Sequence, residues 1–162
     1  MKKRASVLGM ALVLLSATIF TGCGKDGGSA EKNSDLRVAV VCSGSGQNDN
    51  GYNQSACESI EEMSEEVGCE YKVIEPANGV PEALETLADD GYNLIFSLEY
   101  DFDALVKGVG GAEPIAAQYP DTTFVVFNDN PNVDENGETL HDNVISVLFD
   151  VHEAYYLAGY LS

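Results

Sequence analysis

The sequence predicts an α/β fold in which a parallel sheet of about five strands carries helices on both faces. Three observations predict it. Short segments of β-branched and aromatic residues alternate with segments of helical periodicity. The strand segments are continuously apolar rather than alternating, as in sheets covered on both sides. Gly and Pro residues separate the segments.

The first strand and helix are the clearest elements. Residues 36–42 read LRVAVVC, and the polar, glycine-bearing segment 43–51 follows. A helix is then predicted through residue 67, because its apolar residues recur every three or four positions and glutamates fill its other face. The apolar residues are Ala56, Ile60, Met63 and Val67. Gly68 is expected to end this helix.

The later elements repeat the alternation. Strands are expected at 71–74, 93–97, 122–127 and 143–149. A helix that starts near Pro81 and ends before Gly91 has an apolar stripe. Further helical segments are expected at 103–107, 114–119 and 152–161.

The N-terminus has the pattern of an export signal. Basic residues at positions 2–4 precede the apolar run 7–20, which is too short for a comfortable membrane span. Thr21-Gly22-Cys23 resembles a bacterial lipobox, although Phe20 departs from the usual Leu. We therefore predict a signal peptide at 1–22, a lipidated Cys23 and a flexible tether at 23–35. The domain would then lie at the outer face of the cell membrane. An ordinary signal peptide with a coincidental cysteine is the alternative.

Charge and cysteine usage exclude several classes of function. The chain has 8 basic and 27 acidic residues, and without residues 1–22 five basic residues remain beside the same 27 acids, a net charge of −22. Such a chain repels nucleic acid. Cys42, Cys57 and Cys69 are odd in number, so at least one thiol stays free or pairs between chains. With no CxxC or HExxH spacing, we expect no metal site and no cofactor.

The ends of the predicted strands favour a small polar ligand. Ligands of parallel α/β sheets bind beyond the carboxyl ends of the strands, and here these ends are polar or aromatic: 43–53, 97–103, 127–130 and 149–150. The carboxylates there could serve as a general acid and base. However, the sequence has neither a Gly-x-Ser-x-Gly elbow nor a phosphate-binding glycine loop, so we predict a binding protein rather than an enzyme.

Four stretches resemble the basic membrane protein family of nucleoside receptors. They are 48–56 (NDNGYNQSA), 119–124 (YPDTTF) and the pair 143–149 (NVISVLF) with 152–159 (HEAYYLAG). The resemblance implies a type I periplasmic-binding-protein fold of two lobes that close on the ligand. Residues 36–150 would be the first lobe and 151–162 the start of the second, so we expect the chain to be a fragment. It also implies an ABC importer whose permease subunits are the partners, and a nucleoside, in particular a purine nucleoside, as ligand.

The resemblance also suggests which residues bind. Asp49 is expected to accept hydrogen bonds from the ligand, with a turn or helix cap as the alternative. Asn53 is expected to cap the helix, with contact to the ligand as the less favoured alternative. Tyr52 either packs beneath the loop or forms a wall of the cleft. Cys57 occupies the position where we expect a stacking aromatic in the family, so its presence would weaken purine binding.

The remaining site candidates lie on the later loops. Glu99, Tyr100 and Asp129 are expected at the rim, where a carboxylate would bind ribose hydroxyls and either Tyr100 or Phe102 could supply the stacking ring. Two other functions stay open. One is a lipid-anchored sensor or adhesin that binds a protein, and the other is a sugar receptor of the same fold.

Overall fold

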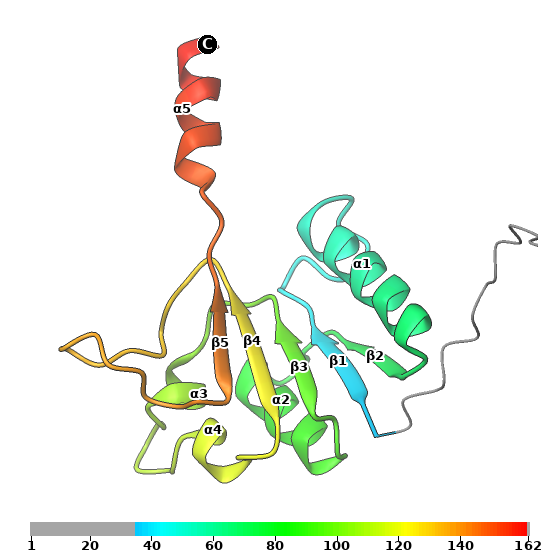
Figure 1. Ribbon diagram of the computed structural model, residues 1–162, viewed down its shortest axis with the longest axis vertical. Coiled ribbons are helices and arrows are strands. Elements are labelled where there is room, and N and C mark those ends of the chain that lie inside the picture. Colours follow the sequence, from blue (N-terminus) through cyan, green and yellow to red (C-terminus); the bar gives the residue numbers. More distant parts are fainter. Residues whose placement is uncertain (1–34, 162) are drawn as a thin grey trace, which may run out of the picture.

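The computed structural model describes residues 35–161 and contains one five-stranded sheet in the order β2-β1-β3-β4-β5 (Figure 1). Every neighbouring pair of strands is parallel. The strands are β1 (Arg37–Val41), β2 (Glu70–Ile74), β3 (Leu94–Ser97), β4 (Thr123–Phe127) and β5 (Val144–Val147). The predicted α/β class is thus confirmed, and the last strand is shorter than expected because its pairing with β4 ends where Val147 meets Phe127.

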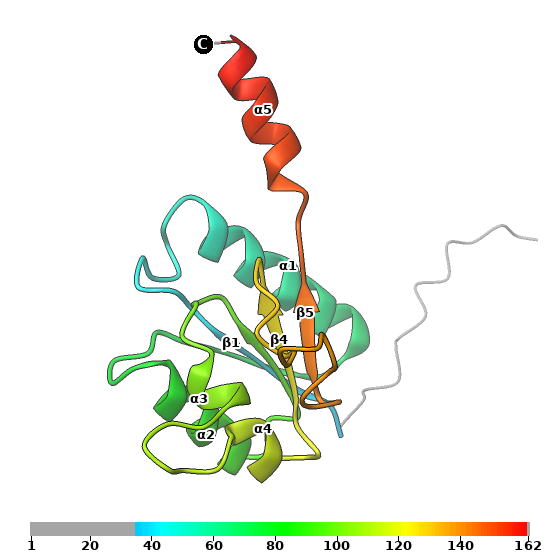
Figure 2. The same ribbon diagram turned by 90° about the vertical axis from the view of Figure 1, so that its left-hand side faces the viewer.

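Helices cover both faces of the sheet. Helix α1 (Tyr52–Val67) lies on one face, and α2 (Val80–Asp89), α3 (Asp103–Val106) and α4 (Ile115–Gln118) lie on the other (Figure 2). Gly68 ends α1 with a left-handed φ of 74°, as predicted from the sequence. The loops after β1 and β3 leave toward opposite faces, which makes the boundary between these two strands the switch point of the sheet.

Two apolar clusters form the core, one on each face. The larger cluster packs Leu84 and Leu87 of α2 against Ile95 and Phe124 of the sheet. The smaller cluster packs Cys57 and Ile60 of α1 against alternate residues of β1. Residues 38–41 of β1 are completely buried because they contribute to both clusters. Burial on both faces explains the continuous apolar run in this strand.

Helix α5 (Val151–Leu161) extends beyond the carboxyl ends of the strands, away from the rest of the lobe (Figure 1). All of its described residues are exposed, including Tyr155, Tyr156, Leu157 and Tyr160. The helix predicted here is confirmed. Between residues 35 and 161 the structure contains no helix that combines the length and the apolar character needed to cross a membrane.

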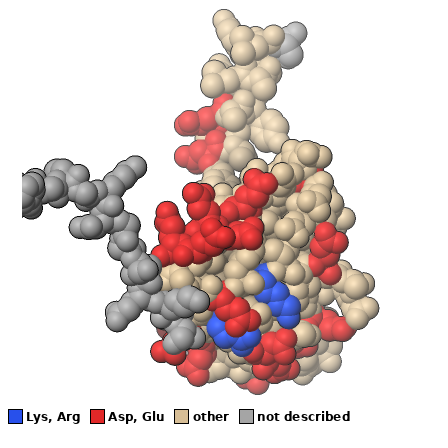
Figure 3. All heavy atoms as spheres, turned by 90° about the vertical axis from the view of Figure 1, so that its right-hand side faces the viewer, with Lys and Arg blue, Asp and Glu red and all other residues tan. Residues whose placement is uncertain are grey.

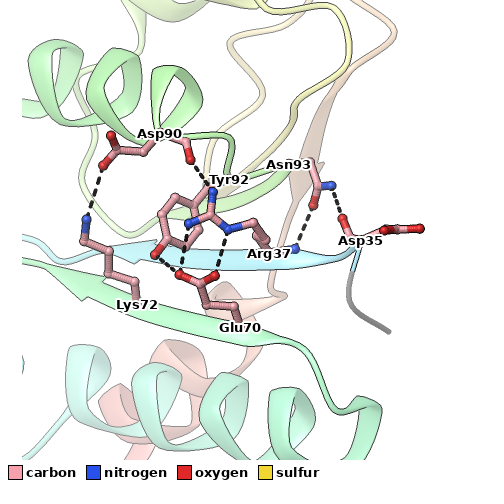
Figure 4. A network of polar contacts seen from close by, with 7 residues as sticks. All are labelled: Asp35, Arg37, Glu70, Lys72, Asp90, Tyr92 and Asn93. Carbon is pink, nitrogen blue, oxygen red and sulfur yellow. Dashed lines mark hydrogen bonds and ion pairs between the residues drawn. The ribbon is translucent and has the colours of Figure 1, made fainter. Parts of the chain in front are cut away.

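A polar network joins β1, β2 and the turn before β3 at the other end of the sheet (Figure 4). The Arg37 guanidinium donates two hydrogen bonds to the Glu70 carboxylate, at 2.8 and 3.0 Å. It also lies 4.3 Å from the centroid of the Tyr92 ring and donates to the carbonyl of Asp90. Tyr92 Oη donates to Glu70 at 2.7 Å. These contacts lower the pKa of Glu70 to about 2, mainly through the hydrogen bond from Arg37.

The Glu70 carboxylate should make stability depend on pH in the acid range. Its folded pKa lies below the ordinary value of 4.5, so its ionised form stabilises the fold above about pH 4.5. This stabilisation is lost as the pH falls toward about 2. We expect Glu70→Gln to make the free energy of unfolding fall less steeply across this window, as measured by urea denaturation. Glu66→Gln, at an exposed position on α1, should keep the original slope. Equal slopes for the Glu70→Gln variant and the unchanged protein would contradict this account.

Candidate ligand-binding site

The carboxyl ends of all five strands meet at one edge of the lobe, where the loops after β1 and β3 approach each other. Gly44 of the first loop donates its backbone N–H to Glu99 Oε2 of the second at 3.0 Å. The other oxygen of this carboxylate accepts the N–H of Tyr100 at 3.0 Å. Glu99 therefore joins the two loops at the switch point, in addition to any contact with a ligand.

A buried amide holds the start of the first loop. Asn53 is completely buried; its Oδ1 accepts the N–H of Ser43 at 3.0 Å and its Nδ2 donates to Ser43 Oγ at 2.8 Å. The prediction that Asn53 caps the helix is wrong, because α1 begins one residue earlier and its N-cap position is Gly51. The prediction failed because the amide is used by a residue ten positions away. With both amide atoms occupied, Asn53 positions the loop and has no exposed surface for a ligand.

The helix cap is supplied by Asp49. Its Oδ1 accepts the N–H groups of Gly51 and Gln54 at 2.9 and 3.1 Å, and its Oδ2 accepts the N–H of Asn53 at 3.2 Å. These backbone donors lower the pKa of the Asp49 carboxyl, the hydrogen bond from Gln54 most of all. The capping alternative for Asp49 is thus what the structure contains, and a carboxylate is the favoured partner for exposed N–H groups at a helix N-terminus.

Glu75 contacts the loop after β1, a role that the sequence analysis did not predict. This residue directly follows β2, and its Oε1 accepts the N–H of Gln47 at 2.8 Å. The same oxygen lies 3.0 Å from the position of a Cβ at Gly46, whose φ is +76°. A side chain at position 46 would therefore strain the backbone and crowd the carboxylate. Only the position of Glu75 at the carboxyl end of a predicted strand could have pointed to this role.

Two tyrosines stand beside this edge. Tyr52 opens α1 and is 38% exposed; burial, with a smaller effect of Tyr100, raises its pKa to about 12. Tyr52 forms one wall of an apolar groove of about 350 Å³. Tyr100 is 54% exposed and packs edge-to-face on Phe102. Its hydroxyl lies 3.4 Å from the side-chain Nδ2 of Asn128 on the loop after β4.

The two remaining candidates lie in different surroundings. Asp129 is exposed on the loop after β4, and its Oδ1 accepts the N–H of Asn130 at 2.8 Å. Cys57 is 1% exposed and packs between α1 and the sheet. The expectation that position 57 faces the cleft is therefore corrected. An aromatic side chain there would enter a filled core, because position 57 lies on the buried face of α1, whose residues recur every three or four positions.

The family model described as "ABC transporter substrate-binding protein PnrA-like", named Bmp, matches residues 36–162. The chain belongs to the Bmp family. The resemblance to basic membrane proteins noted in the sequence is thereby confirmed. The predicted signal peptide and Cys23 lie outside the residues that the structure describes.

Several curated relatives cover nearly the whole Bmp-family chain. "Basic membrane protein A2" of Borrelia garinii is 30% identical over 94% of the chain, and "ABC transporter nucleoside-binding protein BmpA" of Lactococcus lactis is 27% identical over 98%. The "CD4+ T-cell-stimulating antigen" of Listeria innocua is 29% identical over 98%. The chain spans only 42–44% of the length of these relatives.

A solved structure supports the fold of this Bmp-family lobe. A protein fragment from Peptoclostridium difficile 630 superposes with a TM-score of 0.53 at 19% sequence identity, over 78% of this chain and 95% of that one. At this identity the match concerns the fold alone. It supports the parallel α/β architecture of the described residues.

The capping role of Asp49 can be tested in the absence of any ligand. Asp49→Ala removes the acceptor for three N–H groups, so we expect the midpoint of urea unfolding to fall. Asp49→Asn should retain most of the stability, because an Asn side chain also caps well. Urea denaturation of the two variants measures the difference. An Asp49→Ala variant as stable as the unchanged protein would contradict the capping role.

Proposed function

We propose that this Bmp-family chain belongs to an extracytoplasmic, lipid-anchored solute receptor that delivers a nucleoside to the permease of an ABC importer. The observation that carries the proposal is the edge described above. Glu99 joins the loops after β1 and β3 at the switch point of the sheet, where ligands of such sheets bind, and Asn53 holds the start of the first loop. The family match and a relative named as nucleoside-binding support the class of ligand.

The charges of the lobe favour an uncharged ligand. Residues 35–161 contain three basic side chains, and each forms an ion pair: Arg37 with Glu70, Lys72 with Asp90 and Lys107 with Asp103. None of the three follows directly after a strand at the carboxyl edge. That edge carries the carboxylates of Asp49, Glu75, Glu99, Asp101 and Asp129. A phosphate would meet repulsion there without a cation to bind it.

The acidic character extends over the outer face of the lobe. Figure 3 shows acidic side chains gathered on the side of the molecule where α1 lies. The exposed acids of that helix are Glu58, Glu61, Glu62, Glu65 and Glu66. The field of this surface opposes the approach of nucleotides as well as their binding.

A nucleoside also matches the mixture of groups at the edge. Its base has two apolar faces, and the partly exposed rings of Tyr52, at the start of α1, and Tyr100, on the loop after β3, lie at this edge. Its ribose hydroxyls are donors, and carboxylate oxygens are acceptors. Lone-pair positions of Asp49 and Glu99 that do not serve the backbone, and the carboxylate of Asp129, are the acceptors we propose for ribose. The same arrangement favours a nucleoside over a sugar without a base.

Calorimetric titration with inosine and with inosine monophosphate tests the class of ligand. We expect inosine to bind at least about fivefold more tightly than its phosphate, because one like charge near the edge costs about 1 kcal/mol or more. Equal affinity for the two compounds would contradict the electrostatic argument. Binding of sugars or amino acids, with no response to inosine, would overturn the proposed ligand.

The role of Tyr52 has a separate test. Tyr52→Ala removes a ring that we propose stacks on the base, and stacking of this kind contributes about 1–3 kcal/mol. We therefore expect the affinity for inosine to fall about fivefold or more. Tyr52→Phe keeps the ring and is the matched control, which should retain affinity. Thermal denaturation of both variants separates a loss of fold from a loss of binding. Unchanged affinity in a folded Tyr52→Ala variant would remove Tyr52 from the site.

A further inference from the structure

Two cysteine side chains face each other in the smaller core cluster. Cys42 directly follows β1 and Cys57 lies in α1, and their sulfur atoms are 3.7 Å apart. The exposed fractions of the two residues are 0% and 1%. Both thiols are free, and their neighbours Val40, Ile60 and Leu98 are apolar. The ligand site described above uses neither thiol.

We propose that Cys42 and Cys57 are a redox pair that a disulfide oxidant converts into a covalent link between the end of β1 and helix α1. A disulfide bond is about 2.05 Å long, so the two sulfur atoms must approach by less than about 2 Å. The side chains already converge from two elements that pack together. The third thiol is placed differently: Cys69 lies at the end of α1, and its Sγ contacts the carbonyl of Ser64 at 3.7 Å.

The chemistry is a thiol–disulfide exchange in two steps. The thiolate of one cysteine attacks one sulfur of a small disulfide such as oxidised glutathione, which forms a mixed disulfide and releases one glutathione thiolate. The thiolate of the other cysteine then attacks the protein sulfur of the mixed disulfide, which forms the internal bond and releases the second glutathione. Two protons leave the protein and two electrons pass to the oxidant, which is reduced to two thiols.

Burial determines when this exchange can occur. Burial and the contact with Cys57 raise the pKa of Cys42 to about 12. Burial also raises the pKa of Cys57, while hydrogen bonds from Cys42 and Tyr71 oppose that effect. Both thiols are therefore held in the protonated form in the folded core, and the exchange requires local opening of the loop between the two residues or happens while the chain folds.

The link would act on the candidate site. Its ring runs from Cys42 to Cys57 and so contains the whole loop 43–51, with the Asp49 cap and the Asn53 amide. Closing this ring restricts the unfolded chain, which stabilises the folded state when the native geometry accepts the bond. The oxidised form should therefore hold the loop in place even where its hydrogen bonds open transiently.

The test uses the purified full chain with Cys23→Ser and Cys69→Ser, which leaves the two thiols of interest. After incubation with oxidised glutathione, the protein is denatured in urea at neutral pH in the presence of N-ethylmaleimide and weighed by mass spectrometry. We expect a product lighter by two hydrogen atoms that takes up no maleimide. Dithiothreitol should restore two labelled thiols. The oxidised form should also unfold at a higher urea concentration than the reduced form.

A matched variant separates this geometry from chance pairing. The chain with Cys23→Ser and Cys57→Ala keeps Cys42 and Cys69, and we expect its internal disulfide to form at least about tenfold more slowly. Equal rates for the two pairs would overturn the proposal. So would persistent maleimide labelling or glutathione adducts on Cys42 and Cys57, or a disulfide that lowers the urea midpoint. Because the protein is purified, these outcomes do not depend on its ligand or its location in the cell.

Discussion

The parallel pairing of β1 with β2 on one side and β3 on the other is the constraint on which the lobe depends. It buries residues 38–41 on both faces and sends the chain from β1 to one face and from β3 to the other. The loops after these strands therefore start side by side at one edge of the sheet and lead to opposite faces. The loop contacts, the position of α1 and the candidate site all follow from this arrangement.

At this edge, acidic and amide side chains stabilise the backbone conformation of the loops without any ligand present. Asp49 accepts three N–H groups at the start of α1, Glu99 accepts one N–H from each of two loops, and Glu75 accepts one from the first loop. Each acceptor satisfies a donor that would otherwise rely on solvent. The loops thus have a preorganised shape, which lowers the entropic cost of binding. The acidic residues that the sequence suggested as ligand contacts thus use much of their hydrogen-bonding capacity on the backbone of the loops.

Periodicity and glycine positions predicted the strands, α1 and its end at Gly68, because these features depend on local pattern and burial. The contacts within the site were harder to predict. The hydrogen bond between Asn53 and Ser43 joins residues ten positions apart, and the hydrogen bond between Glu99 and Gly44 joins residues 55 positions apart. Such pairs depend on how strands are ordered in space, which composition does not reveal. The orientation of Cys57 could have been predicted, since it shares a helix face with Ile60.

The account rests on the claim that a nucleoside binds where the loops after β1 and β3 meet. Backbone amide NMR spectra of the isotope-labelled protein, recorded while inosine is added, test that claim residue by residue and respond even to weak binding. The account predicts that shifts concentrate in residues 43–53 and 98–103, with little change at Arg37, Glu70 and Tyr92. Shifts centred on that network at the opposite end of the sheet, or no shifts at any inosine concentration, would contradict it.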